Sequence, residues 1–269
     1  MKHTIKKLVA IAGLAALVGT SARAQDYSRN PFHPSFSFSI NAAQFNVANA
    51  PASYGQVPPH PDDVNVLYGP NHPVKTRDAP LKGTTYNAAV LSLGAEISPI
   101  PVKFLDRIKV GYSGTFFSQE DNEQQTTGIK NIQWYEYGAN AATYSRLLLP
   151  AVENSFYVAL DLPMKINEGL GAIARVGISQ DSANTKITKG WDRFGKEEAY
   201  QSDKLELTGN NLFAKLGVFW CPRGQDADYA TKGWEVYGFW KQNNLEGSTS
   251  EGPVELGGDL FGIGGQVNF

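Results

Sequence analysis

The sequence predicts an all-β fold whose antiparallel strands follow one another up and down in chain order. Apolar and polar residues alternate over many short segments, from residue 36 to the last residue. Successive side chains of a strand point to opposite faces, so this period of two indicates strands with one apolar face. Turn-forming stretches separate the segments, and after residue 24 none keeps a helical period over three turns.

Residues 1–24 are predicted to form a cleavable export signal. Three lysines within the first seven residues precede an uncharged apolar stretch over residues 8–19. Ala22 and Ala24 place small residues at the two positions that a signal peptidase reads. The apolar stretch falls short of the roughly 20 residues of a permanent membrane helix. We therefore expect the mature chain to begin at Gln25.

Nine segments carry the strand pattern, and two of them are rich in aromatic residues with less regular alternation. In Asp259–Phe269, for example, Phe261, Ile263 and Val267 share one face, and small or polar residues occupy the other. The regular segments are 36–42, 89–97, 108–116, 156–162, 174–178, 212–220 and 259–269. The aromatic-rich segments are 132–145 and 234–242.

Loops are predicted where turn-forming residues cluster. The longest loop covers 49–83 and is rich in Pro and Gly, which argues against a second folded domain there. Three further loops are expected over 120–131, 180–203 and 243–256. Residues 25–269 are therefore expected to form one domain.

With its export signal, its alternating strands and its ending Gly264-Gly265-Gln266-Val267-Asn268-Phe269, the chain resembles the small outer-membrane β-barrel proteins of Gram-negative bacteria. The resemblance implies an antiparallel up-and-down transmembrane β-barrel in the bacterial outer membrane. It also implies that lipid surrounds the chain and that Phe269 is a signal for the barrel-assembly machinery. A soluble periplasmic β-barrel or sandwich is the alternative.

The number of strands follows from parity, because single-chain barrels of this kind have an even number. Adding residues 185–194, where Ile187 and Trp191 lie in a polar stretch, raises the nine segments to ten. This interpretation places a turn near Ser182 and a loop over 196–202, and it puts the 49–83 loop outside the cell. Ten strands are preferred. Eight, reached by removing the segment around Phe36, are the alternative.

Charged residues on the face opposite the apolar one are expected inside the barrel. They number four acids and four bases: Glu96, Glu136, Asp161 and Glu235, with Lys109, Arg175, Lys215 and Lys241. Buried charges of one sign are costly, whereas paired charges are tolerated. A barrel of eight to ten strands is largely filled by side chains. We therefore expect a polar plug, with Arg175 paired to an inward acid. A narrow ion path is the alternative.

Several classes of function are disfavoured by composition. The 24 basic and 26 acidic residues give no basic surface for nucleic acid. The four histidines lie at 3, 33, 60 and 72, none within a predicted strand beside a serine, so we expect neither an enzyme nor a cofactor. His60, Asp62, Asp63 and His72 match no standard metal-ligand spacing, and no metal is expected.

The predicted function is therefore a structural or surface-interaction role, with loops presented to an extracellular partner. A narrow channel for small solutes or ions is the first alternative. A soluble periplasmic ligand-binding barrel is the second.

Overall fold

The computed structural model describes residues 34–57, 77–78, 81–83, 85–99, 107–117, 141–148, 150–167, 169–193, 196–220 and 233–268. The predicted signal peptide and Phe269 lie outside these residues. The elements are β1 Ser35–Asn49, the 3-10 helix η2 Ala52–Gly55, β2 Gln56–Val57, β3 Arg77–Asp78, β4 Thr85–Ile97, β5 Ile108–Phe117, β6 Ala141–Leu147, β7 Val152–Asn167, β8 Leu170–Arg193, β9 Lys196–Trp220, β10 Gly233–Thr249 and β11 Gly252–Asn268.

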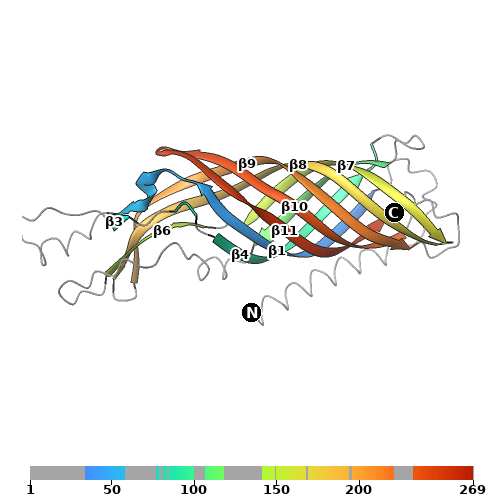
Figure 1. The fold of residues 1–269 in the computed structure, drawn as a ribbon, viewed down its shortest axis with the longest axis horizontal. Helices are drawn as coiled ribbons and strands as arrows, with labels where there is room; N and C mark the ends of the chain where they lie inside the picture. The colour runs from blue at the N-terminus through green and yellow to red at the C-terminus, as the bar shows by residue number, and fades with distance from the viewer. Residues whose placement is uncertain are drawn as a thin grey trace, which may run out of the picture.

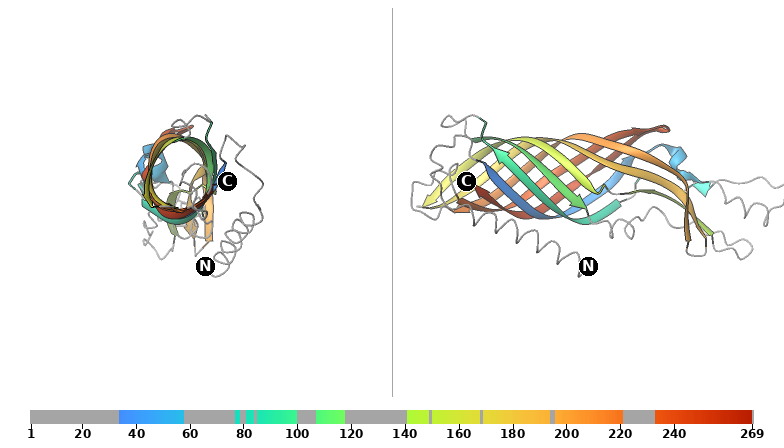
Figure 2. Two further views of the ribbon diagram at one scale, coloured as in Figure 1. Left: turned by 90° about the vertical axis from the view of Figure 1, so that its right-hand side faces the viewer. Right: turned by 180° about the vertical axis from the view of Figure 1, so that it is seen from behind.

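The long strands pair antiparallel and close into a ring (Figure 1). The ring closes where β1 pairs with β11, in a ladder that runs from Ser35 opposite Asn268 to Asn49 opposite Glu255. Viewed along its long axis, the barrel is a closed circle of strands (Figure 2). β6 and β7 both pair with β8, β7 along residues 170–183 and β6 along residues 187–193, so they share one position in the wall. The ring therefore has eight strand positions.

The strand count confirms the alternative of eight, and the preferred count of ten is wrong. Segments 174–178 and 185–194, predicted as two strands, are parts of the 24-residue strand β8. The described part of segment 132–145, residues 141–145, belongs to β6. β6 shares one strand position with β7, which contains Phe156, so the two do not count as separate positions in the ring. The segment around Phe36, whose removal was the sequence route to eight, is retained in the ring as part of β1.

Two predicted loops are also corrected by the pairing. Ser182 pairs with Thr208 inside the β8–β9 ladder, so no turn occurs there, and Arg193 pairs with Lys196. The predicted loop over 196–202 is therefore part of β9. Most of the predicted loop over 243–256 is a paired hairpin, in which Thr249 lies opposite Gly252. These ladders make the barrel longer than the sequence segments indicated.

The barrel has two halves of opposite polarity. We call the half that holds Ser35 and Asn268 the terminal half, and the half that holds the β8–β9 and β10–β11 turns the loop half. Along β1, the outward Phe36 and Ile40 of the terminal half are 56% and 62% exposed. Farther along the same strand, in the loop half, the apolar Phe45 and Val47 point inward and are 1% and 0% exposed.

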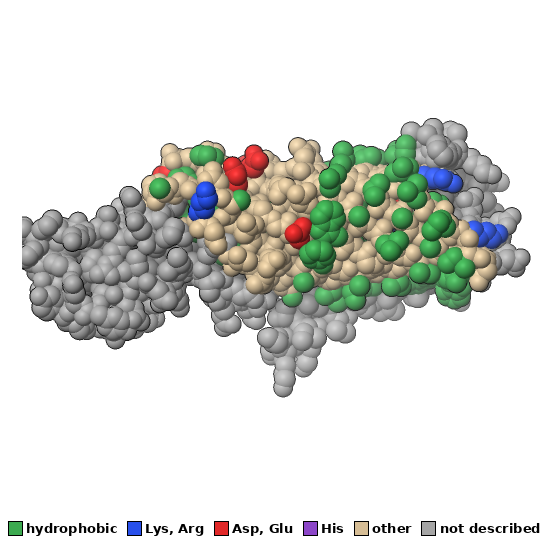
Figure 3. Space-filling model, in the orientation of Figure 1, with side chains coloured by type: hydrophobic (Ala, Val, Ile, Leu, Met, Phe, Trp, Pro, Cys, Tyr) green, Lys and Arg blue, Asp and Glu red, His purple; other side chains and the backbone are tan. Residues whose placement is uncertain are grey.

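The outer surface follows the same division. In the space-filling view, hydrophobic side chains are concentrated over the half near the C-terminus, and the rest of the described surface is mostly polar (Figure 3). The apolar side chains of the loop half lie inside the barrel instead. They form a core that includes Phe45, Val47, Tyr86, Ala88, Val90, Phe117, Ile187, Leu205, Leu207, Leu245, Val254, Leu256 and Leu260. The loop half is therefore built like a water-soluble barrel.

Candidate functional site

Arg175 lies at the centre of a buried ion cluster in the terminal half. Its guanidinium donates to both oxygens of Glu96, at 2.6 and 2.9 Å. On its other side it contacts Asp161, with one bond of 2.8 Å from Nη2 to Oδ2. Asp161 is the cross-strand neighbour of Arg175, whereas Glu96 comes from β4. The planar guanidinium can bind two carboxylates in this forked manner.

Neighbouring side chains complete this terminal cluster. Tyr157 donates to Glu96 at 2.8 Å, and the amide nitrogen of Gln266 donates to the other Glu96 oxygen at 2.7 Å. Lys215 pairs with Glu235 at 2.6 Å and donates to Gln266 at 2.6 Å. The cluster therefore joins side chains from six strands of the ring, which fixes these strands relative to one another.

A second buried cluster lies farther along the barrel, around Lys241 of β10. Its ammonium group is 2.6 Å from Glu153 and 2.9 Å from Asp181. It also donates to Ser155 at 2.9 Å. Asn243 donates to Glu153 at 3.2 Å. This upper cluster joins β7, β8 and β10 directly across the lumen.

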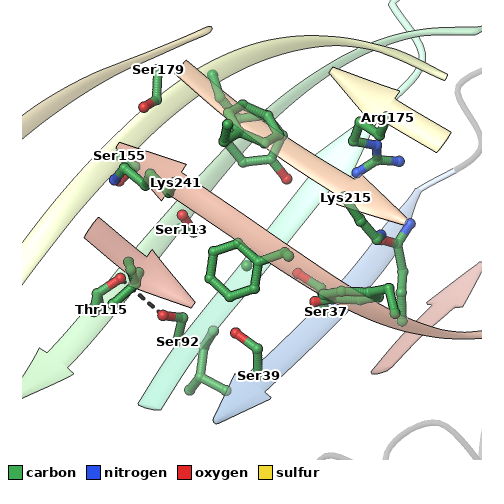
Figure 4. A pocket seen from close by; sticks show the side chains of 18 residues that line it. Ser37, Ser39, Ser92, Ser113, Thr115, Ser155, Arg175, Ser179, Lys215 and Lys241 are labelled. Carbon is green, nitrogen blue, oxygen red and sulfur yellow. Dashed lines mark hydrogen bonds between the residues drawn. The ribbon is translucent and has the colours of Figure 1, made fainter. Parts of the chain in front are cut away.

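A cavity of about 90 Å³ lies between the two clusters. Figure 4 shows its serine and threonine side chains, with Lys241 towards one end and Arg175 and Lys215 towards the other. Phe213, Tyr237 and Phe239 line it as well. The volume suffices for a few water molecules, each of which needs about 10–15 Å³ on this measure.

Aromatic rings inside the barrel lie over glycines of the neighbouring strand. Four of the directly paired glycine–aromatic positions show this fit: Gly111 with Tyr157, Gly171 with Phe219, Gly177 with Phe213, and Gly264 with Tyr237. In each pair, a Cβ on the glycine would collide with the ring. The missing side chain therefore makes room for an aromatic ring in a narrow lumen, a device that also supports strand curvature.

Seven of the eight charged residues expected inside the barrel are buried there: Glu96, Lys109, Asp161, Arg175, Lys215, Glu235 and Lys241. Five of them meet around Arg175 and Lys215. Lys109 instead donates to Ser98 at 2.6 Å, and Lys241 belongs to the upper cluster. The eighth, Glu136, lies outside the described residues.

Glu153 and Asp181 were missed by sequence reasoning, although both are 0% exposed. Both continue the inward parity of neighbouring residues, Ser155 for Glu153 and Ser179 for Asp181. That signal was present in the sequence, but Glu153 lies before the predicted segment 156–162 and Asp181 lies in the predicted loop 180–203. With them and Lys189, the buried charges of the described residues comprise five acids and five bases: Glu96, Glu153, Asp161, Asp181 and Glu235, with Lys109, Arg175, Lys189, Lys215 and Lys241.

The part of the chain that the structure describes contains no group of three or more His, Cys, Asp or Glu side chains arranged to hold a metal ion. Within the same residues, no helix has the length and apolar character needed to cross a membrane. The four histidines of the sequence lie outside the described ranges.

A closed ring of eight up-and-down strands, apolar outside and charged inside over its terminal half, defines a β-barrel of the outer-membrane type. The resemblance drawn from the sequence is thus confirmed at the level of the fold. No protein-family model matches the chain. No curated protein sequence matches it either.

Solved structures of outer-membrane β-barrels align with most of the chain at low similarity. The attachment invasion locus protein Ail of Yersinia pestis aligns over 88% of this chain and 99% of its own, with 9% identity and a TM-score of 0.29. Neisserial surface protein A aligns over 87% and 97%, with 11% identity and a TM-score of 0.29. The outer-membrane protease OmpT of Escherichia coli aligns over 89% and 98%, with 8% identity and a TM-score of 0.31. Values this low do not identify the function of this chain.

Proposed function

We propose that this chain is an outer-membrane β-barrel with a sealed lumen, which presents its loop half at the cell surface in a structural or interaction role. The observation that carries the proposal is the double closure of the interior. The terminal half is filled by the Arg175 and Lys241 clusters, and the loop half is filled by an apolar core.

The outward face of the terminal half supports a membrane location. Leu212, Leu216 and Trp220 of β9 are 54%, 69% and 55% exposed. They belong to a nine-residue segment, 212–220, and a tilted strand needs about 9–11 residues to cross a bilayer. Soluble monomers rarely expose an apolar surface of this extent. This feature disfavours the soluble periplasmic alternative.

The orientation follows from the positions of the strand ends. Outer-membrane barrels keep short turns and both termini on the periplasmic side. Ser35 and Asn268 lie together at the end of the terminal half. The connections from β1 to β4, from β8 to β9 and from β10 to β11 therefore face outward. The 49–83 connection belongs to this outward group.

A structural role fits the interior chemistry better than catalysis does. Ser155 lies 2.9 Å from Lys241, a spacing that would suit a serine activated by a lysine. However, the Lys241 ammonium group is engaged by the carboxylates of both Glu153 and Asp181. It therefore serves as a cation in the network rather than as a base.

Planar-bilayer recording separates the sealed barrel from the narrow channel. We expect the purified full chain to insert without producing conductance steps. A matched variant, Arg175→Ala with Asp161→Ala and Glu96→Ala, removes the three charges at the centre of the terminal cluster but leaves the apolar core, and it should also remain silent. Regular conductance steps from the wild-type chain would contradict the sealed lumen.

Cysteine labelling on intact cells tests the orientation. In a Cys221→Ser background, Ser248→Cys lies in the loop half and Lys165→Cys at the opposite end, both at exposed positions. A membrane-impermeant maleimide should label Ser248→Cys in intact cells and should label Lys165→Cys only after lysis. The reverse pattern would show that the loop half does not face the outside.

A further inference from the structure

Carboxamide side chains lie along the edge of the apolar surface that faces the loop half. On six strands, the first polar outward residue reached on passing from the apolar surface towards the loop half is Asn or Gln, and on β7 the apolar Val152 lies beyond it. These residues, which we call the amide belt, are Gln44, Asn87, Asn154, Gln180, Asn210 and Gln242. They come from β1, β4, β7, β8, β9 and β10. The amide belt therefore runs around most of the barrel wall.

On a seventh strand, β11, the corresponding outward residue is an acid. Asp259 of β11 accepts a hydrogen bond of 2.9 Å from the indole nitrogen of Trp240. Among the described strands, no Lys or Arg occupies the first or second outward position beyond the apolar surface. The exposed Lys186 and Lys204 lie farther into the loop half. The edge is thus rich in hydrogen-bonding groups and lacks cations.

The side chains of the amide belt favour one type of lipid headgroup over another. A carboxamide both donates and accepts hydrogen bonds, as a sugar hydroxyl does. A phosphate offers acceptors alone and is bound by Arg and Lys. The amide belt therefore complements uncharged hydroxyl groups and provides no charge for an anionic headgroup.

The position of the belt identifies what would lie against it. Each belt residue is two residues beyond an outward residue of the apolar surface, which is roughly 7 Å along a strand. A lipid whose acyl chains contact that surface would hold its headgroup at this height. Gln180 follows Ile178 in this way, and Ile178 is 61% exposed. The occupant would thus be continuous with the lipid of the same leaflet.

We propose that the amide belt binds the uncharged sugar headgroups of outer-leaflet glycolipids. The inference rests on the proposed function, since it assumes that the terminal half lies in a membrane. It adds a specificity to that function: the barrel prefers glycolipid neighbours to anionic phospholipid neighbours, through hydrogen bonds from six strands.

Native mass spectrometry of the full chain in detergent tests the preference. The probes are diglucosyl diacylglycerol and phosphatidylglycerol with identical acyl chains, added in equal amounts. We expect the wild-type chain to retain the glycolipid over phosphatidylglycerol by about threefold or more, given several hydrogen bonds of ordinary strength. Equal retention, or preference for phosphatidylglycerol, would overturn the proposal.

Two matched variants locate the effect. The belt variant carries Ala at Gln44, Asn87, Gln180, Asn210 and Gln242, and it spares Asn154, which accepts a hydrogen bond from Tyr112. The control variant carries Ala at Thr85, Asn46, Asn184, Thr208 and Asn244, five exposed positions farther from the apolar surface. The belt variant should lose the preference and the control should keep it. A belt variant that keeps the preference would refute the proposal. A wild-type chain that forms a dimer, which the belt substitutions dissociate, would also refute it, because the belt would then be an interface between two copies of the chain.

Flotation with phosphatidylcholine vesicles separates this proposal from the function on which it rests. Both variants and the wild type should float, because the apolar surface is intact in all three. A wild-type chain that stays with the soluble fraction would contradict the membrane location itself. Flotation without a glycolipid preference would contradict the amide-belt proposal alone.

Discussion

Arg175 shows how a single side chain can hold distant strands of a narrow barrel together. Its two carboxylate partners are 2% and 0% exposed, and its own side chain is 3% exposed. None of the three is therefore solvated, and each carboxylate depends on the guanidinium for compensation. Removing one partner of a buried ion pair usually costs more stability than the pair contributes.

Arg175→Met is expected to lower the free energy of unfolding by about 3–5 kcal/mol, because Glu96 and Asp161 would stay buried without a cation. Urea unfolding in detergent, followed by tryptophan fluorescence, measures the change. The matched control adds Glu96→Gln and Asp161→Asn to the same variant, which removes both uncompensated charges. This triple variant should recover most of the lost stability. A triple variant as unstable as the single one would show that packing, rather than charge, is responsible.

Gly177→Ala tests the fit between glycine and aromatic ring. The new Cβ would lie 2.7 Å from the Val158 carbonyl oxygen and would also collide with the Phe213 ring. We expect a loss of about 1–3 kcal/mol, as for other overpacked sites. Gly238→Ala is the control, because its Cβ would meet no heavy atom closer than 3.9 Å. Equal urea midpoints for the two variants would contradict the role of this pairing.

The turn of the β10–β11 hairpin is held to other elements of the loop half by side-chain contacts. Glu251 in its turn is 3.3 Å from Lys189 of β8 and accepts a bond of 2.9 Å from Gln201 of β9. Lys189 also donates to the Ser53 carbonyl oxygen of η2 at 2.7 Å. Four elements of the loop half therefore meet at one carboxylate and one ammonium group.

This junction should weaken in acid. Partial burial opposes ionisation of Glu251, but hydrogen bonds from Ser53 and Gln201 and the charge of Lys189 outweigh it, so its pKa falls below the ordinary value of 4.5. A carboxyl group whose pKa is lowered by folding stabilises the fold at pH values above its pKa in the unfolded state. This stabilisation is lost as the pH falls through its pKa in the folded state. Amide exchange over 247–254, corrected for the intrinsic rate, should accelerate below pH 4.5. Glu251→Gln should abolish this pH dependence. An unchanged dependence would exclude Glu251 as its source.

At the same scale, strand alternation could be predicted wherever lipid-facing residues are large and apolar. Phe36, Phe38 and Ile40 made β1 visible, and the same pattern revealed the terminal halves of the other long strands. Alternation also placed Arg175 and Asp161 on the inward face, because charged residues stand out on a strand that is apolar on its other side.

The loop half escaped sequence prediction because the polarity of the two faces exchanges while the strand continues. In β8, the outward side chains change from Val176 and Ile178 to Gln180 and Asn184, and the inward ones become Ala183 and Ile187. The polar stretch at the exchange looks like a turn. Glu153 and Asp181 lie at this exchange, which is why these two acids of the upper cluster were missed although Lys241 was predicted to point inward. The pairing of Arg175 with Glu96 joins strands β4 and β8, and local alternation holds no information about that contact.

On the scale of the whole molecule, one barrel has to satisfy two solvents. Its strands reach 24 and 25 residues in β8 and β9, whereas about 9–11 suffice to cross a bilayer. The excess length forms the loop half, whose apolar core is inside and whose polar face is outside, as water requires. The terminal half has the opposite arrangement, as lipid requires. The upper cluster, the cavity and the terminal cluster fill the lumen where the outer surface is apolar.

Spin labelling of β9 in reconstituted vesicles tests this two-solvent account most directly. Single cysteines at the outward even-numbered positions from 204 to 220, in a Cys221→Ser background, would carry the label. Collision with oxygen should dominate from 212 to 220, and collision with a water-soluble nickel complex should dominate from 204 to 208, with the change near Asn210. Nickel accessibility along the whole strand would contradict the account by indicating a soluble barrel. Oxygen dominance along the whole strand would contradict it by placing the loop half in lipid.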